Sequence, residues 1–243
     1  MAETNFQTEF TVTYPECDMN NNLRLSGLMR HVQQIGGAHL DHLGLSYHRM
    51  AADGFVLLLA KEGLAIRRMP KGGERVTLRT APRRPKGAVL LRDCTFLGED
   101  GEELVFAETT WVAADTKCHR ILRPKDIPYD FLESLEEREY TVTAKRVKEP
   151  KNIRTIGTRV VRYSDLDCNH HLTNAVYADI VCDFLPYEVI SAHVPKTFFV
   201  HFQHEAAYEE ELTIRVGEQE ECGFVVIGVK PSGETCFTAM AEF

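Results

Sequence analysis

One motif occurs twice in the sequence, and this duplication constrains the fold more than any other feature. The segments "YPECDMNNNLRL" (14–25) and "YSDLDCNHHLTN" (163–174) share a tyrosine, an aspartate, an asparagine and a leucine at a constant offset of 149 residues. Internal repetition of this kind indicates two copies of one structural unit. The matched pairs are Tyr14 and Tyr163, Asp18 and Asp167, Asn20 and Asn169, and Leu23 and Leu172.

The segments that follow each motif also match. Apolar residues recur at helical spacing after the first copy, and "NAVYADIVCDFL" (174–185) is apolar nearly all round, which predicts a buried helix. Alternating, strand-like segments begin at Glu74 and Glu210, and each is followed by a hairpin pattern with a glycine turn (97–111 and 229–243). Each half therefore reads as a strand, a buried helix and several antiparallel strands, an α+β unit whose sheet wraps a central helix.

The composition sets the boundaries and excludes several classes. A chain of 243 residues allows one large domain or two of about 120 residues, and we expect units at 1–123 and 156–243 joined by a charge-rich linker at 124–155. The net charge of −8 argues against a general nucleic-acid binder, and no apolar run is long enough to span a membrane. The start, "MAETNFQTEF", resembles no targeting peptide, so a cytoplasmic location is expected. The seven cysteines form no CxxC pair and are expected to be mostly buried thiols.

The second copy carries a concentration of polar groups before its helix. Asp167, Asn169 and His171 are spaced two apart, so an extended backbone would place them on one face. Thr173 or Asn174 is the expected N-cap of the helix that follows. Polar side chains beside a helix N-terminus are suited to stabilising a developing oxyanion.

Two positions distinguish the second copy from the first. Asn22 stands where the second copy has His171, and an alignment that sets Glu210 on Glu74 places Glu205 on Met69. An imidazole that titrates near neutral pH is what proton transfer needs. Because Glu205 lies between Phe202 and Ala206 in the sequence, we expect its carboxyl to be partly desolvated and paired with His171.

Other chemistries fit the spacing less well. An H-x-x-H-E string is formed by His201, His204 and Glu205. It matches neither H-E-x-x-H nor H-x-x-E-H, the helix motifs of metalloproteases, so no metal or cofactor is expected. Cys168 would point to the face opposite Asp167 in an extended segment, which favours a packed thiol over a nucleophile.

The second motif resembles the D-x-N-x-H-x-x-N signature of the acyl-acyl-carrier-protein (acyl-ACP) thioesterases, and the resemblance covers nearly the whole chain. It implies a double (tandem) hotdog fold, with two antiparallel sheets each wrapped around a long central helix. Asn174 matches the last asparagine of the signature. Two features depart from the family pattern: Thr173 stands where a second asparagine is usual, and His170 adds an imidazole next to His171. The catalytic set implied by the resemblance is Asp167, Asn169, His171 and Glu205.

The resemblance also implies a function: hydrolysis of fatty acyl-ACP to free fatty acid and holo-ACP in fatty acid biosynthesis. The first half would house the acyl chain, with pocket candidates Met29, Ile35, Phe55, Leu57 and Met69. A basic stretch is expected either to be solvated strand faces or to dock the acidic carrier protein through Arg67, Arg68, Lys71, Arg83, Arg84 and Lys86. Rivals are an acyl-CoA thioesterase, a hotdog dehydratase and a non-catalytic acyl-binding protein. Exposed sheet edges would allow a homodimer.

Overall fold

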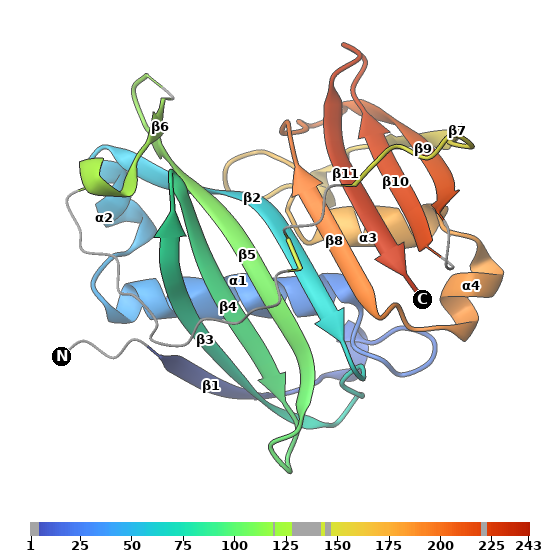
Figure 1. Ribbon diagram of the computed structural model, residues 1–243, viewed down its shortest axis with the longest axis horizontal. Helices are drawn as coiled ribbons and strands as arrows, with labels where there is room; N and C mark the ends of the chain where they lie inside the picture. Colours follow the sequence, from blue (N-terminus) through green and yellow to red (C-terminus); the bar gives the residue numbers. More distant parts are fainter. Residues whose placement is uncertain (1–4, 119, 128–141, 144–146, 220–222) are drawn as a thin grey trace.

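The two halves share one continuous antiparallel sheet (Figure 1). The computed structural model describes residues 5–118, 120–127, 142–143, 147–219 and 223–243. Its 11 strands follow the order β1-β3-β4-β5-β2-β8-β11-β10-β9-β7, with β6 pairing β5 at one end. The two sheets implied by the resemblance are therefore joined into one. The sheets merge because β2 of the first half and β8 of the second pair directly through their backbones.

The elements recur in the same order in both halves. The first half contains β1 (Phe6–Thr11), a 3₁₀ turn at Tyr14–Glu16, α1 (Leu25–His42), α2 (Tyr47–Ala52), β2 (Phe55–Ile66), β3 (Arg75–Lys86), β4 (Val89–Leu97), β5 (Glu103–Asp115), β6 (Ile121–Leu122) and a 3₁₀ turn at Pro124–Asp126. The second half contains β7 (Arg154–Val160), a 3₁₀ turn at Tyr163–Asp165, α3 (Val176–Phe184), α4 (Tyr187–Ala192), β8 (Thr197–Phe202), β9 (Glu211–Gln219), β10 (Gly223–Val229) and β11 (Thr235–Glu242). Of the predicted linker, the structure describes 124–127, 142–143 and 147–155.

The pairing of β2 with β8 reveals an approximate twofold symmetry. Gly63 pairs with Phe199, and these two residues are also equivalent when the halves are aligned at an offset of 136 residues. Because equivalent residues of the two halves face each other in this strand pair, the symmetry axis passes between Gly63 and Phe199. The alignment that relates Glu205 to Met69 uses the same offset, so the strand register supports it.

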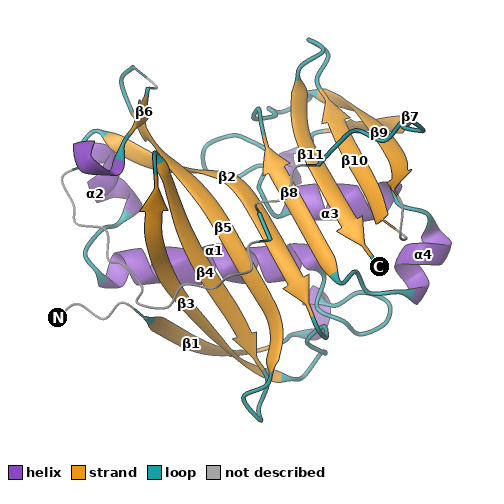
Figure 2. Cartoon of the chain, in the orientation of Figure 1, coloured by secondary structure: helices purple, strands orange, loops and turns teal. Residues whose placement is uncertain are grey.

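Both main helices lie on one face of the sheet (Figure 2). α1 has 18 residues and α3 has 9, so the expectation of a long central helix in each half is not confirmed. α3 stops at Phe184 because Pro186 follows, and a residue that precedes proline is biased away from helical backbone. Buried side chains from both helices and both halves of the sheet form one apolar cluster. No helix in the described part of the chain is long and apolar enough to cross a bilayer.

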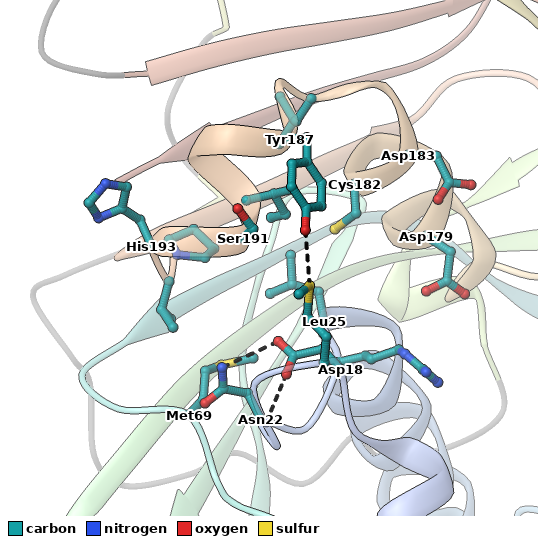
Figure 3. Close-up of a pocket in the computed structure, with 16 residues that line it drawn as sticks. Asp18, Asn22, Leu25, Met69, Asp179, Cys182, Asp183, Tyr187, Ser191 and His193 are labelled. Atoms are coloured by element: carbon teal, nitrogen blue, oxygen red, sulfur yellow. Dashed lines mark hydrogen bonds between the residues drawn. The ribbon is translucent and has the colours of Figure 1, made fainter.

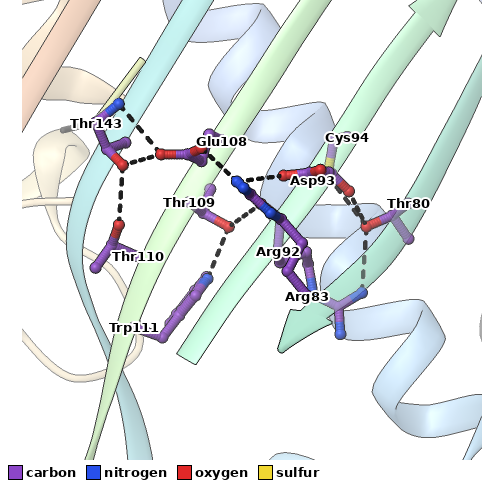
Figure 4. A network of polar contacts seen from close by, with 10 residues as sticks. All are labelled: Thr80, Arg83, Arg92, Asp93, Cys94, Glu108, Thr109, Thr110, Trp111 and Thr143. Carbon is purple, nitrogen blue, oxygen red and sulfur yellow. Dashed lines mark hydrogen bonds and ion pairs between the residues drawn. The ribbon is translucent and has the colours of Figure 1, made fainter. Parts of the chain in front are cut away.

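The opposite face carries a buried polar network under residues 142–143 (Figure 4). Arg83, which is 6% exposed, donates to Glu108 at 2.6 Å and lies 3.4 Å from Asp93. The other oxygen of Glu108 accepts from the backbone N–H and the hydroxyl of Thr143. A buried cation needs this kind of pairing to offset its desolvation. Arg83 thus has a structural role, and its predicted place in a docking surface is wrong.

Candidate active site

The segment 167–171 forms a tight turn rather than the expected extended stretch. The Asp167 N–H donates to the His171 carbonyl at 2.8 Å, and the His170 N–H donates to the Asp167 carbonyl at 3.1 Å. Oδ1 of Asp167 accepts from the N–H groups of Asn169 (2.8 Å) and His171 (3.2 Å). A short carboxylate side chain commonly stabilises a turn in this way. Oδ1 of Asp167 is therefore engaged by the turn, and the three side chains do not share a strand face.

The first half builds the same turn. Oδ1 of Asp18 accepts from the N–H groups of Asn20 (2.8 Å) and Asn22 (2.9 Å). Asn21 and His170 occupy equivalent places with positive φ angles of 60° and 65°. Asparagine tolerates this conformation better than most residues, and the exposed His170 sits where the turn needs it. His170 belongs to the turn geometry, which leaves His171 as the imidazole that faces the neighbouring loop.

His171 and Glu205 lie within ion-pair distance, as expected. Nδ1 of His171 is 3.2 Å from Oε2 of Glu205. The backbone of His171 bridges Ala207, and the Leu172 N–H donates to the Ala206 carbonyl at 2.8 Å. These contacts dock the turn against the loop that follows β8. The structure thus brings together the imidazole and the carboxylate that are specific to the second half.

The expected desolvation of Glu205 is wrong. Its side chain is 69% exposed, and that of His171 is 37% exposed. β8 ends at Phe202, so Glu205 lies in a loop and its sequence neighbours do not enclose it. Cys168 is also exposed, contrary to the packed thiol that was expected, because it belongs to the turn.

Asn169 contacts the other half of the molecule. Its Oδ1 accepts a hydrogen bond from the hydroxyl of Tyr47 at 3.2 Å, and Tyr47 begins α2 of the first half. Neither Thr173 nor Asn174 caps α3: the N-cap is Ala175, with no side-chain hydrogen bond. Sequence reasoning missed Tyr47, because nothing near position 47 resembles the motif and the contact depends on how the two halves pack.

A cavity of about 260 Å³ lies between α1 and the sheet in the first half. Tyr47 borders it, so the hydroxyl that contacts Asn169 also stands beside this cavity. Leu57 borders it too, whereas Met29, Ile35 and Phe55 are at most 2% exposed and packed in apolar clusters. Its other lining residues are mostly apolar and include Leu40, Leu45, Met50, Leu90, Leu91 and Trp111.

A second cavity of about 410 Å³ lies beside the turn of the first half (Figure 3). Asp18 and Asn22 face it, and Met69 lines it where the second half carries Glu205. Asp179 and Asp183 of α3 add two carboxylates, and burial together with the neighbouring Asp179 raises the pKa of Asp183. The pocket candidate Met69 is thus separated from the cavity that Leu57 borders.

The remaining docking candidates do not form one basic surface. Arg68 is paired at 2.8 Å with Glu74 and with Glu102, and Nζ of Lys71 donates to Asn22 at 2.6 Å. The candidates fall into two groups at opposite ends of β3, a strand of 12 residues that is about 40 Å long. The group near its start is Arg67, Arg68 and Lys71, and the group near its end is Arg84 and Lys86.

Comparison with known proteins identifies the relatives. The profile described as "Acyl-ACP thioesterase N-terminal domain" matches residues 3–135, and "Acyl-ACP thioesterase C-terminal domain" matches residues 148–243. A curated relative, a dodecanoyl-[acyl-carrier-protein] hydrolase of Cinnamomum camphora, is 20% identical over 241 residues, which cover 90% of this chain and 62% of the relative. The chain spans about half to three fifths of the length of the curated relatives it matches.

Solved structures share the fold over the whole chain. An acyl-ACP thioesterase from Bacteroides thetaiotaomicron superposes with a TM-score of 0.85 at 20% identity, covering 99% of this chain and 98% of its own. A 12:0-ACP thioesterase from Umbellularia californica gives 0.84 at 17% identity, with 100% and 98% coverage. The antiparallel sheet with few helices is thus of the hotdog type. With both family domains matched in order along its length, the chain belongs to the acyl-ACP thioesterase family.

Proposed function

We propose that this protein hydrolyses fatty acyl thioesters of acyl carrier protein, releasing a free fatty acid and the carrier thiol. Membership of the family and the names of the curated relatives support the reaction class. The observation that carries the proposal is the His171–Glu205 pair at 3.2 Å beside the cavity-bordering Tyr47 and its partner Asn169. The first half has Asn22 and Met69 at the matching positions and cannot offer the same pair.

His171 and Glu205 act together as the base that activates water. The water oxygen bonds to the thioester carbonyl carbon, its proton passes to the His171–Glu205 pair, and the carbon–sulfur bond breaks. The leaving thiolate has a conjugate acid with a pKa near 8.5, by analogy with cysteine, so it departs with little help and takes up the proton afterwards. Direct attack by Asp167 is the alternative route, and because its Oδ1 accepts two N–H groups of its own turn, Oδ2 would be the attacking oxygen.

Asn169 supplies the donor for the carbonyl oxygen. Tyr47 donates to Oδ1 of Asn169 and thereby orients the amide group. Nδ2 makes no hydrogen bond to any described residue, so it is available to donate to the carbonyl oxygen of the substrate. In the first half the matching Nδ2 of Asn20 is used, because it donates to the Ser191 carbonyl at 2.8 Å. A fixed donor that is aimed in advance is what stabilises a developing oxyanion.

The cavity of the first half holds the acyl chain. Its lining is mainly apolar, and Tyr47 places its border beside the catalytic turn. Each buried methylene stabilises by about 0.8 kcal/mol, so two carbons change affinity by roughly tenfold or more. Chain-length preference then depends on residues such as Leu57, Leu90 and Trp111.

An acyl-CoA thioesterase and a non-catalytic acyl-binding protein remain the alternatives. Both are tested by measuring thiol release from acyl-ACP and from acyl-CoA over a range of chain lengths, with His171→Asn as the inactive reference. We expect turnover with a higher kcat/KM on acyl-ACP. Higher kcat/KM on acyl-CoA would favour the first alternative, and binding without thiol release would favour the second.

Location and assembly stay predictions. The plant relatives are named as chloroplastic, whereas a cytoplasmic location is proposed for this chain. A homodimer would use the outer strands β1 and β7 of the sheet, and light scattering of the purified protein would detect it.

A further inference from the structure

Lys230 makes two contacts that hold the loop carrying Glu205. It follows β10 in the turn to β11, and its Nζ donates to the backbone carbonyl of Glu205 at 2.8 Å. The same Nζ lies 3.2 Å from Oε1 of Glu210, and both side chains are 18% exposed. Oε2 of Glu210 accepts from the Ala207 N–H at 3.0 Å. One cation and one carboxylate thus brace both sides of the loop at 205–210.

The first half has the same brace with a different cation. Arg68 pairs with Oε1 of Glu74 at 2.8 Å, and its Nη1 donates to the Met69 carbonyl at 3.4 Å. Oε2 of Glu74 accepts from the Lys71 N–H at 2.8 Å. Met69, Lys71 and Glu74 correspond to 205, 207 and 210 at the offset of 136 residues. In both halves a cation therefore contacts the equivalent backbone carbonyl and the equivalent glutamate. The brace is thus a feature of the repeated unit and not of one loop alone.

The cation comes from a different place in the catalytic half. At the offset of 136 residues, the residue equivalent to Arg68 is His204, which directly precedes Glu205. The residue equivalent to Lys230 is Gly98, because both open a hairpin turn with the same backbone hydrogen bonds: Lys230 with Glu234 and Gly233, and Gly98 with Glu102 and Gly101. A guanidinium at 204 would stand beside the Glu205 carboxylate and compete with His171 for it. The first half has no such carboxylate to protect. A side chain at Gly98 would also meet Glu102, since a Cβ there lies 2.3 Å from Oε1.

We propose that Lys230 is the positioning residue of Glu205, supplying the loop's cation from the opposite hairpin so that the carboxylate stays available to His171. This inference rests on the proposed hydrolytic function. Glu205 is 69% exposed, so side-chain packing does little to fix it and the backbone must do so. Other ties near it are the His204 N–H to the Cys236 carbonyl at 3.0 Å, the Cys236 thiol to the His204 carbonyl at 3.1 Å and the Leu172 N–H to the Ala206 carbonyl at 2.8 Å. Within the described residues, Lys230 is the group that holds the Glu205 carbonyl.

The primary test is Lys230→Met, which keeps the aliphatic stem and removes the ammonium. Since misplacing a catalytic group by about 1 Å can cost up to 10²-fold, we expect kcat to fall by about 10-fold or more, with KM changed less than about threefold. Lys230→Arg should recover most of the kcat. The decisive comparison is Lys230→Met in a Glu205→Gln background, where it should lower kcat no further, because the carboxylate it positions is already gone.

A matched pair separates positioning from general stability. Glu210→Gln and Glu74→Gln remove the equivalent acids of the two braces. We expect comparable losses of thermal stability, but a lowered kcat for Glu210→Gln alone. An equal kcat loss from both, or a further loss from Lys230→Met when Glu205 is already Gln, would overturn the proposal. If Lys230→Met fails to fold, the Glu210→Gln and Glu74→Gln pair tests the brace in its place.

Hydrogen exchange gives a readout that does not need turnover. Backbone amides of 203–210 should exchange faster in Lys230→Met than in the wild type, and those of 67–74 should not change. If exchange responds in this way but the wild type releases no thiol, the brace stands and the proposed hydrolysis is refuted. Unchanged exchange in 203–210 would refute the brace.

Discussion

The two halves of the chain build the same turn from the same aspartate, but they use it differently. Asp18 and Asp167 each accept two N–H groups of their own turn, and both turns dock on a loop that a cation and a glutamate brace. Asn22 and Met69 of the first half become His171 and Glu205 in the second. The comparison teaches that the shared geometry belongs to the scaffold, and that the proposed chemistry enters at positions where the scaffold does not need a particular side chain.

The largest expected effect comes from making the second turn resemble the first. His171→Asn removes the imidazole and keeps a residue that the same turn tolerates at Asn22. We expect kcat to fall by about 10²-fold or more with little change in thermal stability, because proton transfer is lost and the fold is not. Thiol release and a melting curve check this. The matched control, Asn22→Ala, should leave kcat within about twofold, and a comparable loss there would break the comparison.

The aspartates test whether scaffold and chemistry can be separated. Asp167→Ala removes two backbone hydrogen bonds of its turn, and Asp18→Ala removes the two equivalent bonds and one more from Nδ2 of Asn22 at 3.2 Å. We expect a destabilisation of about 1–2 kcal/mol for each in denaturant unfolding, slightly larger for Asp18→Ala. Asp167→Ala should also lower kcat by about 10-fold or more, since it releases Asn169 and His171. If Asp167→Ala lost activity without losing stability, a direct chemical role for this carboxylate would be indicated instead.

A smaller effect is expected at the contact between the halves. Tyr47→Phe removes the hydroxyl that orients Asn169 and keeps the ring at the cavity border. The loss of one hydrogen bond of about 1 kcal/mol corresponds to roughly a fivefold lower kcat. Tyr187→Phe is the symmetric control, because the Tyr187 hydroxyl lies 3.9 Å from the Met19 sulfur and contacts no motif asparagine in the described part of the chain. Equal effects from both substitutions would argue against a role for Tyr47 in orienting Asn169.

The buried interiors differ as well, and this predicts a pH effect on stability. Glu62 of β2 is 1% exposed, and neither of its carboxyl oxygens has a hydrogen-bond partner among the described residues, whereas its symmetric counterpart is the buried Phe198. Burial raises the pKa of Glu62 well above its ordinary value. Above about pH 4.5 the unfolded chain loses this proton while the folded chain keeps it, so the carboxyl lowers stability as pH rises toward the folded pKa.

Glu62→Gln should remove that pH dependence. We expect its melting temperature to match the wild type near pH 4.5 and to exceed it by a growing margin toward pH 8. A margin that stayed constant or shrank with pH would show that Glu62 is ionised in the folded protein.

The sequence was enough to predict the duplicated unit and the proximity of His171 and Glu205, because both depend on matching positions between two copies of one pattern. It could not predict that the turn is closed, since two-residue spacing fits a strand equally well and only the hydrogen bonds of Asp167 decide it. The burial of Arg83 depends on Glu108 and Thr143, which are distant from it in sequence. The exposure of Glu205 depends on β8 ending at Phe202, a strand end that the neighbouring apolar residues do not signal. The contacts of Tyr47 and Lys230 also arise from packing that no local motif encodes.

The most direct measurement is the rate of thiol release from acyl-ACP by Glu205→Gln, a substitution that keeps the shape and the loop while removing the charge. If the His171–Glu205 pair activates water, kcat falls by about 10²-fold or more while the folded protein and its acyl-ACP affinity persist. A folded Glu205→Gln protein that turns over at close to the wild-type rate would contradict the assignment of catalysis to this pair.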